Sequence, residues 1–296
     1  MPDADGKTQS KEKDFGIGVP METPGFFLKG SAHLDWGMKN RLARIFNPKS
    51  GRTLMLAFDH GYIMGPTSGI ERMDLAIPPL MPHVDCLMCT RGALRTCISP
   101  ETDKPAVLRC STGATVLRDL SNEVIGVAID DALRLNAAAV TTQVCIGAEY
   151  ERATLDNLSK LINEGNRHGV PTLGVTAVGK EMVRDARYLG LACRVIGELG
   201  AHFVKTYYCE PGFEEVAAGC PVPVVIAGGK KIPEADALNM AHKAIQQGAQ
   251  GVDMGRNIFC AGDPVAMVRA VRAVVHDNEP PDKALDMYET MKNEKE

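Results

Sequence analysis

Short apolar runs recur along the chain, and longer stretches of mixed polarity separate them. Buried parallel strands are short and almost wholly apolar, so each run predicts a strand, and each intervening stretch is compatible with a helix. The starts of successive runs lie 21 to 33 residues apart. The expected strands are Thr53–Phe58, Val84–Cys89, Ala106–Arg109, Ala139–Val144, Thr172–Thr176, Phe203–Lys205, Val224–Ile226 and Gly251–Met254.

Alternating strands and helices form either a closed barrel or an open doubly wound sheet. A dinucleotide-binding open sheet would carry G-x-G-x-x-G directly after its first strand. Here the first strand is followed by Asp59-His60-Gly61-Tyr62 instead. Eight repeated units therefore favour the α/β class and a (β/α)₈ TIM barrel.

The chain before the first strand predicts a flexible segment over residues 1–30 and then a helix over His33–Phe46. That helix precedes the barrel, so we expect it to cover one end. Residues 31–296 are expected to form a single barrel domain with C-terminal helices. Glycines suit the left-handed residue after a helix end, and they stand before three strands, at Gly169, Gly200 and Gly248.

Composition and charge narrow the possible partners. The 296 residues carry a net charge of −4 with no block of like charges, so neither a nucleic-acid nor a membrane partner is expected. The polar start lacks the apolar core of a secretory signal, which favours a cytoplasmic protein. Nine cysteines are then expected as reduced thiols. Cys86 and Cys89 form C-x-x-C inside an apolar run, and the second pair that a zinc ribbon needs is missing.

In a TIM barrel the active site forms at the carboxyl ends of the strands. Lys205 ends the sixth strand, where burial and nearby cations would free its amine to attack a carbonyl. The alternative is a solvated lysine just beyond a strand.

Two further strand ends offer proton-transfer and anion-binding groups. Asp59 and His60 follow the first strand; both can move protons, and Asp59 could alternatively orient a lysine ammonium. The same residues also suit a simple turn. Arg109 ends the third strand, where it either assists an anionic substrate or pairs with a carboxylate at the edge of the core.

The loops after strands seven and eight predict a phosphate site. Gly228, Gly229 and Lys230 follow the seventh strand, and Gly255 and Arg256 follow the eighth. Barrels frequently bind phosphate with these two loops, whose backbone N–H groups and cations converge on the anion. The alternative is a pair of glycine turns beside surface cations.

These motifs together resemble the archaeal-type class I fructose-bisphosphate aldolases, which are Schiff-base barrels without a metal. The resemblance extends from about Leu28 to about His276. It is more specific for one branch, whose members also match at residues outside the candidate site. The matching stretches are LDWGMKNRLARIFNPKSGRT, MLAFDHGY, LMCTRG, AGCPVPVVIAGGKK and GVDMGRNIF. Members of that branch are thiolases that complete the degradation of phosphorylated autoinducer-2.

The resemblance implies a reaction, its residues and an assembly. The acetyl group of 3-hydroxy-5-phosphonooxypentane-2,4-dione passes to coenzyme A, giving acetyl-CoA and dihydroxyacetone phosphate. The essential lysine and histidine of the branch fall on Lys205 and His60. Coenzyme A is a co-substrate, no cofactor or metal is bound, and a homo-oligomer, a decamer, is implied.

One departure from the aldolases is informative. They carry a tyrosine acid/base after strand five, in a motif ending Tyr-Pro-Arg-Gly, whereas this chain has Val175–Lys180 there, with Ala177 at the tyrosine position. Proton transfer by the usual aldolase route is therefore not expected, and His60 is the candidate for it, with Asp59 positioning Lys205 or the substrate hydroxyl.

Other chemistries remain open on the sequence. A Schiff-base aldolase acting on a phosphorylated sugar is the main alternative, and a phosphosugar-binding protein without catalysis is another. Classical thiolases use a cysteine nucleophile, and three cysteines lie near strand ends without a paired histidine: Cys89, Cys110 and Cys209.

Overall fold

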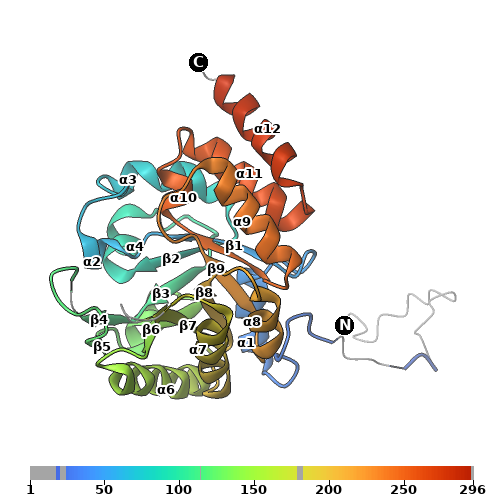
Figure 1. Ribbon diagram of the computed structural model, residues 1–296. Coiled ribbons are helices and arrows are strands. Elements are labelled where there is room, and N and C mark those ends of the chain that lie inside the picture. Colours follow the sequence, from blue (N-terminus) through green and yellow to red (C-terminus); the bar gives the residue numbers. More distant parts are fainter. Residues whose placement is uncertain (1–17, 21–24, 114, 179–182, 295–296) are drawn as a thin grey trace, which may run out of the picture.

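Eight parallel strands close into a barrel in this computed structural model, which describes residues 18–20, 25–113, 115–178 and 183–294 (Figure 1). Around the barrel the strands neighbour one another in the order β1-β10-β9-β8-β7-β6-β3-β2. The prediction of a (β/α)₈ barrel is confirmed. The barrel strands are β1 Thr53–Ala57, β2 Cys86–Thr90, β3 Ala106–Arg109, β6 Ala139–Ile146, β7 Thr172–Val178, β8 Phe203–Tyr207, β9 Val224–Ala227 and β10 Gly251–Met254.

All eight expected strands are present, and their boundaries differ from the expected ones by at most two residues at each end. A short antiparallel hairpin, which the sequence pattern did not predict, lies outside the barrel; its strands are β4 Ser111–Gly113 and β5 Glu123–Ile125. The expectation of a flexible segment over residues 1–30 falls largely on residues outside those described.

Helices surround the barrel, and the last one, α12, packs against α9 and α11 (Figure 1). Gly169, Gly200 and Gly248 follow α6, α7 and α9 with positive φ angles of 67°, 105° and 101°, as predicted for the residue after a helix end. The helices are α1 Trp36–Ile45, α2 Gly61–Met64, α3 Met73–Ala76, η1 Pro78–His83, α4 Arg91–Cys97, α5 Ile129–Arg134, α6 Glu151–His168, α7 Ala186–Glu198, α8 Phe213–Gly219, α9 Glu234–Gln246, α10 Arg256–Phe259, α11 Pro264–Asp277 and α12 Pro281–Asn293.

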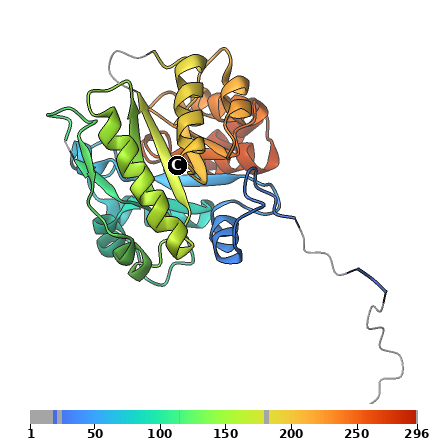
Figure 2. The same ribbon diagram turned by 90° about the horizontal axis from the view of Figure 1, so that it is seen from below.

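Helix α1 closes the end of the barrel at which the strands begin. The helix starts after Asp35, whose carboxylate accepts a hydrogen bond from Met38 N at 2.8 Å. Its apolar face belongs to the same buried cluster as the inward side chains of the strands, and Phe46 meets Phe203 edge-on with ring centroids 5.4 Å apart. Figure 2 shows α1, in blue, set apart from the helices that flank the strands. The predicted cover over one end is therefore present, and the opposite end is open.

Candidate active site

The alternation of side chains along β8 places Lys205 inside the barrel. Successive strand residues point to opposite faces, so Phe203, Lys205 and Tyr207 share the inward face. Phe203 packs at the closed end, and Tyr207 lines the pocket at the open end. Lys205 lies between them with only 8% of its surface exposed. The alternative of a solvated lysine is therefore wrong.

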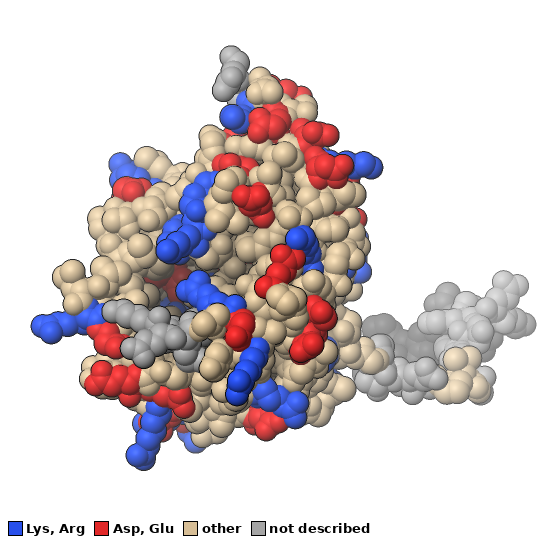
Figure 3. All heavy atoms as spheres, in the orientation of Figure 1, with Lys and Arg blue, Asp and Glu red and all other residues tan. Residues whose placement is uncertain are grey.

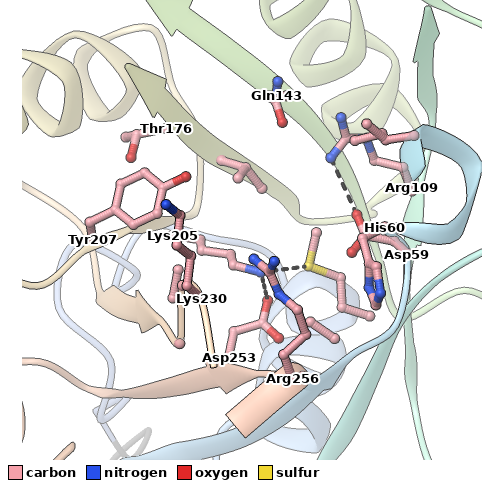
Figure 4. A pocket seen from close by; sticks show the side chains of 18 of the residues that line it. Asp59, His60, Arg109, Gln143, Thr176, Lys205, Tyr207, Lys230, Asp253 and Arg256 are labelled. Atoms are coloured by element: carbon pink, nitrogen blue, oxygen red, sulfur yellow. Dashed lines mark hydrogen bonds and ion pairs between the residues drawn. The ribbon is translucent and has the colours of Figure 1, made fainter. Parts of the chain in front are cut away.

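Lys205 Nζ lies 2.8 Å from a carboxylate oxygen, Oδ2 of Asp253 on β10 (Figure 4). It also contacts Met88 Sδ at 3.5 Å. Burial raises the pKa of Asp253, and the charge of Lys205 opposes that rise. The expectation that Asp59 positions Lys205 is corrected, because Asp253 pairs with Lys205 and Asp59 pairs with a different residue.

That residue is Arg109, whose Nη1 lies 3.3 Å from Asp59 Oδ2. The guanidinium is buried and donates further hydrogen bonds to Glu123 at 2.7 Å, Tyr62 at 2.6 Å and Ser111 at 2.9 Å. The structure thus shows the carboxylate pairing that was one of the two expectations for Arg109. Because several hydrogen bonds hold its guanidinium group in place, Arg109 fixes the position of Asp59 at the pocket wall.

His60 follows Asp59 and presents its ring beside the pocket. The ring stacks on Phe259 with centroids 5.9 Å apart and an interplanar angle of 15°. Its Nε2 is buried and has no hydrogen-bond partner among the described residues. Burial lowers the pKa of His60, as do the charges of Arg256 and Lys205, while Asp59 raises it. The imidazole is therefore neutral near pH 7 and able to accept a proton.

The two glycine loops meet at the pocket as predicted. Gly229 has a φ of 69°, a conformation that favours glycine, and Gly255 allows no side chain because a Cβ would lie 2.2 Å from Ala57 O. Asn257 joins the loops: its Nδ2 donates to Gly228 O at 2.6 Å, and its Oδ1 accepts from Ile232 N at 2.9 Å. The loops are thereby held in one arrangement.

One cavity of about 290 Å³ brings every predicted site residue together. On the face shown in Figure 3, Lys and Arg side chains border a central hollow. Residues that sequence analysis did not single out also line it. The predicted lining residues are Asp59, His60, Arg109, Lys205, Gly228, Gly229, Lys230, Gly255 and Arg256, and the additional ones include Gln143, Thr176, Arg184, Tyr207 and Asp253.

Asp253 is the most consequential of the additional residues. The signal that could have revealed it is a single acidic residue within an otherwise apolar strand, which requires a buried partner. Arg184 and Tyr207 form a second feature of the wall, with the guanidinium carbon 3.7 Å from the ring centroid. No pattern in the sequence indicated that pair, because 23 positions separate the two residues and only the fold joins them.

The cysteines lie away from this chemistry. All nine are free thiols, and Cys86 and Cys89 are buried in β2. None of Cys89, Cys110 and Cys209 lines the cavity, and burial raises the pKa of each thiol, for Cys110 to about 12. These thiols are poor nucleophiles near neutral pH.

Within residues 18–20, 25–113, 115–178 and 183–294, no group of three or more His, Cys, Asp or Glu side chains is arranged to hold a metal ion. Over the same ranges, no helix combines the length and apolar character needed to span a membrane.

Comparison with known proteins places the chain in a family. The family model described as DeoC/LacD family aldolase matches residues 53–261. A protein of Photorhabdus laumondii is 59% identical over 276 residues, which cover 93% of this chain and 95% of that protein. A protein of Yersinia pseudotuberculosis is 60% identical over 267 residues, 90% and 92% of the two chains. Both are named 3-hydroxy-5-phosphonooxypentane-2,4-dione thiolase, the enzyme also called LsrF.

Solved structures point to the same family. An archaeal fructose 1,6-bisphosphate aldolase superposes with a TM-score of 0.73 at 25% identity, covering 81% of this chain and 99% of that one. A second structure, with a TM-score of 0.72 at 25% identity and the same coverage, is described with its catalytic lysine covalently bound to the carbinolamine intermediate of the substrate. The resemblance to class I fructose-bisphosphate aldolases and to their thiolase branch is confirmed.

Proposed function

The chain belongs to the DeoC/LacD aldolase family, and within it we propose that it is a thiolase acting on 3-hydroxy-5-phosphonooxypentane-2,4-dione. The acetyl group passes to coenzyme A, giving acetyl-CoA and dihydroxyacetone phosphate, in the degradation of phosphorylated autoinducer-2. The observation that carries this proposal is the high identity to thiolases of that name, combined with a buried lysine in a cavity that suits a phosphorylated ketone.

The phosphate of the substrate is assigned to the two glycine loops. Gly228 N–H already donates to Asp253 O at 3.4 Å, so the backbone N–H groups offered to the anion are those of Gly229 and Gly255, while Lys230 and Arg256 supply positive charge. Binding there holds the adjacent ketone at C4 close to Lys205, so the reaction begins from a fixed geometry.

Lys205 forms a Schiff base with the C4 ketone. The resulting iminium withdraws electrons from C3, which allows the C2–C3 bond to break once the thiol has added to the C2 carbonyl. The acetyl group leaves on sulfur as acetyl-CoA. The C3 enamine takes up a proton, and hydrolysis then releases dihydroxyacetone phosphate and the free lysine.

His60 moves the proton that these reaction steps require. Its neutral imidazole removes the proton from the thiol of coenzyme A, and the imidazolium returns it to C3. Asp59, held by Arg109, orients the C3 hydroxyl of the substrate. In this assignment Arg109 acts through Asp59 and contacts the pocket wall rather than the phosphate.

The alternative function is a Schiff-base aldolase acting on a phosphorylated sugar, and the likeness to the solved aldolases favours it. Both functions predict covalent trapping of Lys205, so that measurement does not separate them. Ala177 stands at the position of the aldolase tyrosine, so the side chain that transfers the proton during sugar cleavage in those aldolases is missing here.

Product analysis with and without coenzyme A tests the proposal. We expect acetyl-CoA and dihydroxyacetone phosphate from the phosphorylated dione only when coenzyme A is added, and neither product from Lys205→Ala. Turnover of the dione without coenzyme A, or cleavage of fructose 1,6-bisphosphate at a comparable rate, would support the aldolase instead. Binding of the dione without turnover would support a phosphosugar-binding protein.

The same proposal includes partners and location. Coenzyme A is a co-substrate rather than a bound cofactor, no metal takes part, and the protein works in the cytoplasm as a homo-oligomer, a decamer by family resemblance. Light scattering on the purified protein measures the mass of the assembly against the 31.9 kDa chain.

A further inference from the structure

Strand β10 contains one charged side chain, Asp253, and it points into the barrel. Only 1% of its surface is exposed, so the carboxylate has lost its water and requires hydrogen bonds or charges in exchange. Its Oδ2 lies 2.8 Å from Lys205 Nζ. Its Oδ1 is buried and has no hydrogen-bond partner among the residues that the structure describes.

Buried carboxylates elsewhere in the molecule have more partners. Glu123 accepts hydrogen bonds from Arg109, Ser111 and Tyr62. Asp85, near the closed end of the barrel, is largely buried and accepts from the backbone N–H of Leu54 and from Arg272 of α11, and its Oδ2 lies 2.8 Å from His276 Nε2. These carboxylates have the multiple bonds expected of structural groups. Asp253 lacks them, although it contacts the atom that reacts in the proposed mechanism.

We propose that Asp253 is a catalytic residue that moves a proton on and off the nitrogen of Lys205. The carboxylate accepts a proton from the ammonium, and the neutral amine then adds to the substrate ketone. After proton transfer from nitrogen to the new alkoxide, the carbinolamine carries one hydroxyl group. Asp253 returns its proton to that hydroxyl, which leaves as water, and the resulting carboxylate pairs with the iminium.

The step balances without another reactant. One ammonium and one ketone become one iminium and one water, while Asp253 ends in the charge state in which it began. Burial favours the intermediate pair of neutral amine and neutral acid, because it raises the pKa of Asp253. Asp59 is less suited to this work, since its Oδ2 already forms the ion pair with Arg109 at 3.3 Å.

This inference rests on the proposed function only in that Lys205 forms the covalent adduct. Reductive trapping tests it without coenzyme A. Protein is mixed with dihydroxyacetone phosphate and cyanoborohydride between pH 5 and 9, and the gain in intact mass is followed over time. Lys205→Ala supplies the background. We expect Asp253→Asn to slow trapping about 100-fold or more at every pH, the usual size of a general acid–base contribution.

The opposite result follows if Asp253 is only the counter-ion of Lys205. Losing the charge would then favour the free amine, and Asp253→Asn would trap as fast as the wild type or faster, which overturns the proposal. Asp85→Asn is the matched control, because it removes another largely buried, ion-paired carboxylate. It is expected to lower the melting temperature and leave trapping unchanged.

A second variant covers the case in which Asp253→Asn does not fold. Asp253→Ala leaves room for a small acid, and added formate is expected to restore trapping while chloride at equal ionic strength does not. Equal restoration by both salts would overturn the proposal. Acetyl-CoA formation by the wild type is measured separately, so failure of the thiolase assay is distinguishable from failure of the Asp253 assignment.

Discussion

Replacing Glu123 by glutamine tests the polar cluster behind the pocket wall. The carboxylate and the Arg109 guanidinium lie 2.7 Å apart, and each side chain is only 3% exposed. The amide keeps the size of the side chain but removes its charge, so Arg109 retains a single carboxylate neighbour, Asp59. Breaking a buried ion pair by removing one partner costs about 3–5 kcal/mol, and the remaining amide hydrogen bonds place this variant near the lower value.

Stability and activity are both expected to change. For 296 residues the entropy of unfolding is about 0.6 kcal/mol per kelvin, so a loss of about 3 kcal/mol lowers the Tm by about 5 °C. Arg109 is expected to move toward Asp59 once Glu123 is neutral. A displacement of Asp59 on the order of 1 Å lowers kcat by about 100-fold. Calorimetry and initial rates of acetyl-CoA formation measure the two effects.

An exposed ion pair supplies the control. Arg72 and Asp74 lie 2.6 Å apart with side chains 67% and 43% exposed, and Asp74→Asn is expected to change neither Tm nor kcat measurably. If Glu123→Gln melts within 1 °C of the wild type and keeps its kcat, the cluster neither stabilises the barrel nor positions Asp59, and the reasoning is refuted.

Three further predictions concern the closed end of the barrel and two histidines. Phe46→Ala removes the ring that packs against Phe203, so we expect a loss of about 3–5 kcal/mol in urea denaturation; a loss below about 1 kcal/mol would contradict a packed cover. Burial lowers the pKa of His202 to about 4, so protonation favours the unfolded chain. The contribution of neutral His202 to the free energy of unfolding is complete above about pH 6.5, and about 3 kcal/mol of it is lost as the pH falls toward 4. In urea titrations, His202→Gln should remove this pH dependence. Burial also lowers the pKa of His60, so the acidic limb of kcat/KM for acetyl transfer should lie below pH 6.5, and a limb above that value would contradict a neutral base.

The strands were predictable because burial on both faces leaves a strong local pattern. A central strand of a barrel must be apolar almost throughout, so Ala106–Arg109 and Gly251–Met254 could be located to the residue. The hairpin Ser111–Gly113 and Glu123–Ile125 has three-residue strands with exposed and polar positions, and no comparable pattern marks it. Its strands pack against α6 and β6, which are contacts that only the fold supplies.

The site was predictable as far as strand ends could be counted. Lys205, His60 and the glycine loops follow strands, and the barrel rule brings strand ends together. The partners of those residues could not be obtained in this way. Whether Asp59 or Asp253 pairs with Lys205 depends on the directions of the side chains and on the ion pair between Arg109 and Asp59. Only the three-dimensional structure shows these.

Among the described residues, helix α1 covers the barrel end at which the strands begin, and the cavity opens at the other end. In the proposed reaction both reactants enter, and both products leave, through that opening. The phosphorylated dione occupies the deeper position in the proposed reaction, beside Lys205, and coenzyme A reaches its carbonyl from above. Steady-state kinetics should therefore follow a compulsory order, in which the dione binds before coenzyme A and acetyl-CoA departs before dihydroxyacetone phosphate.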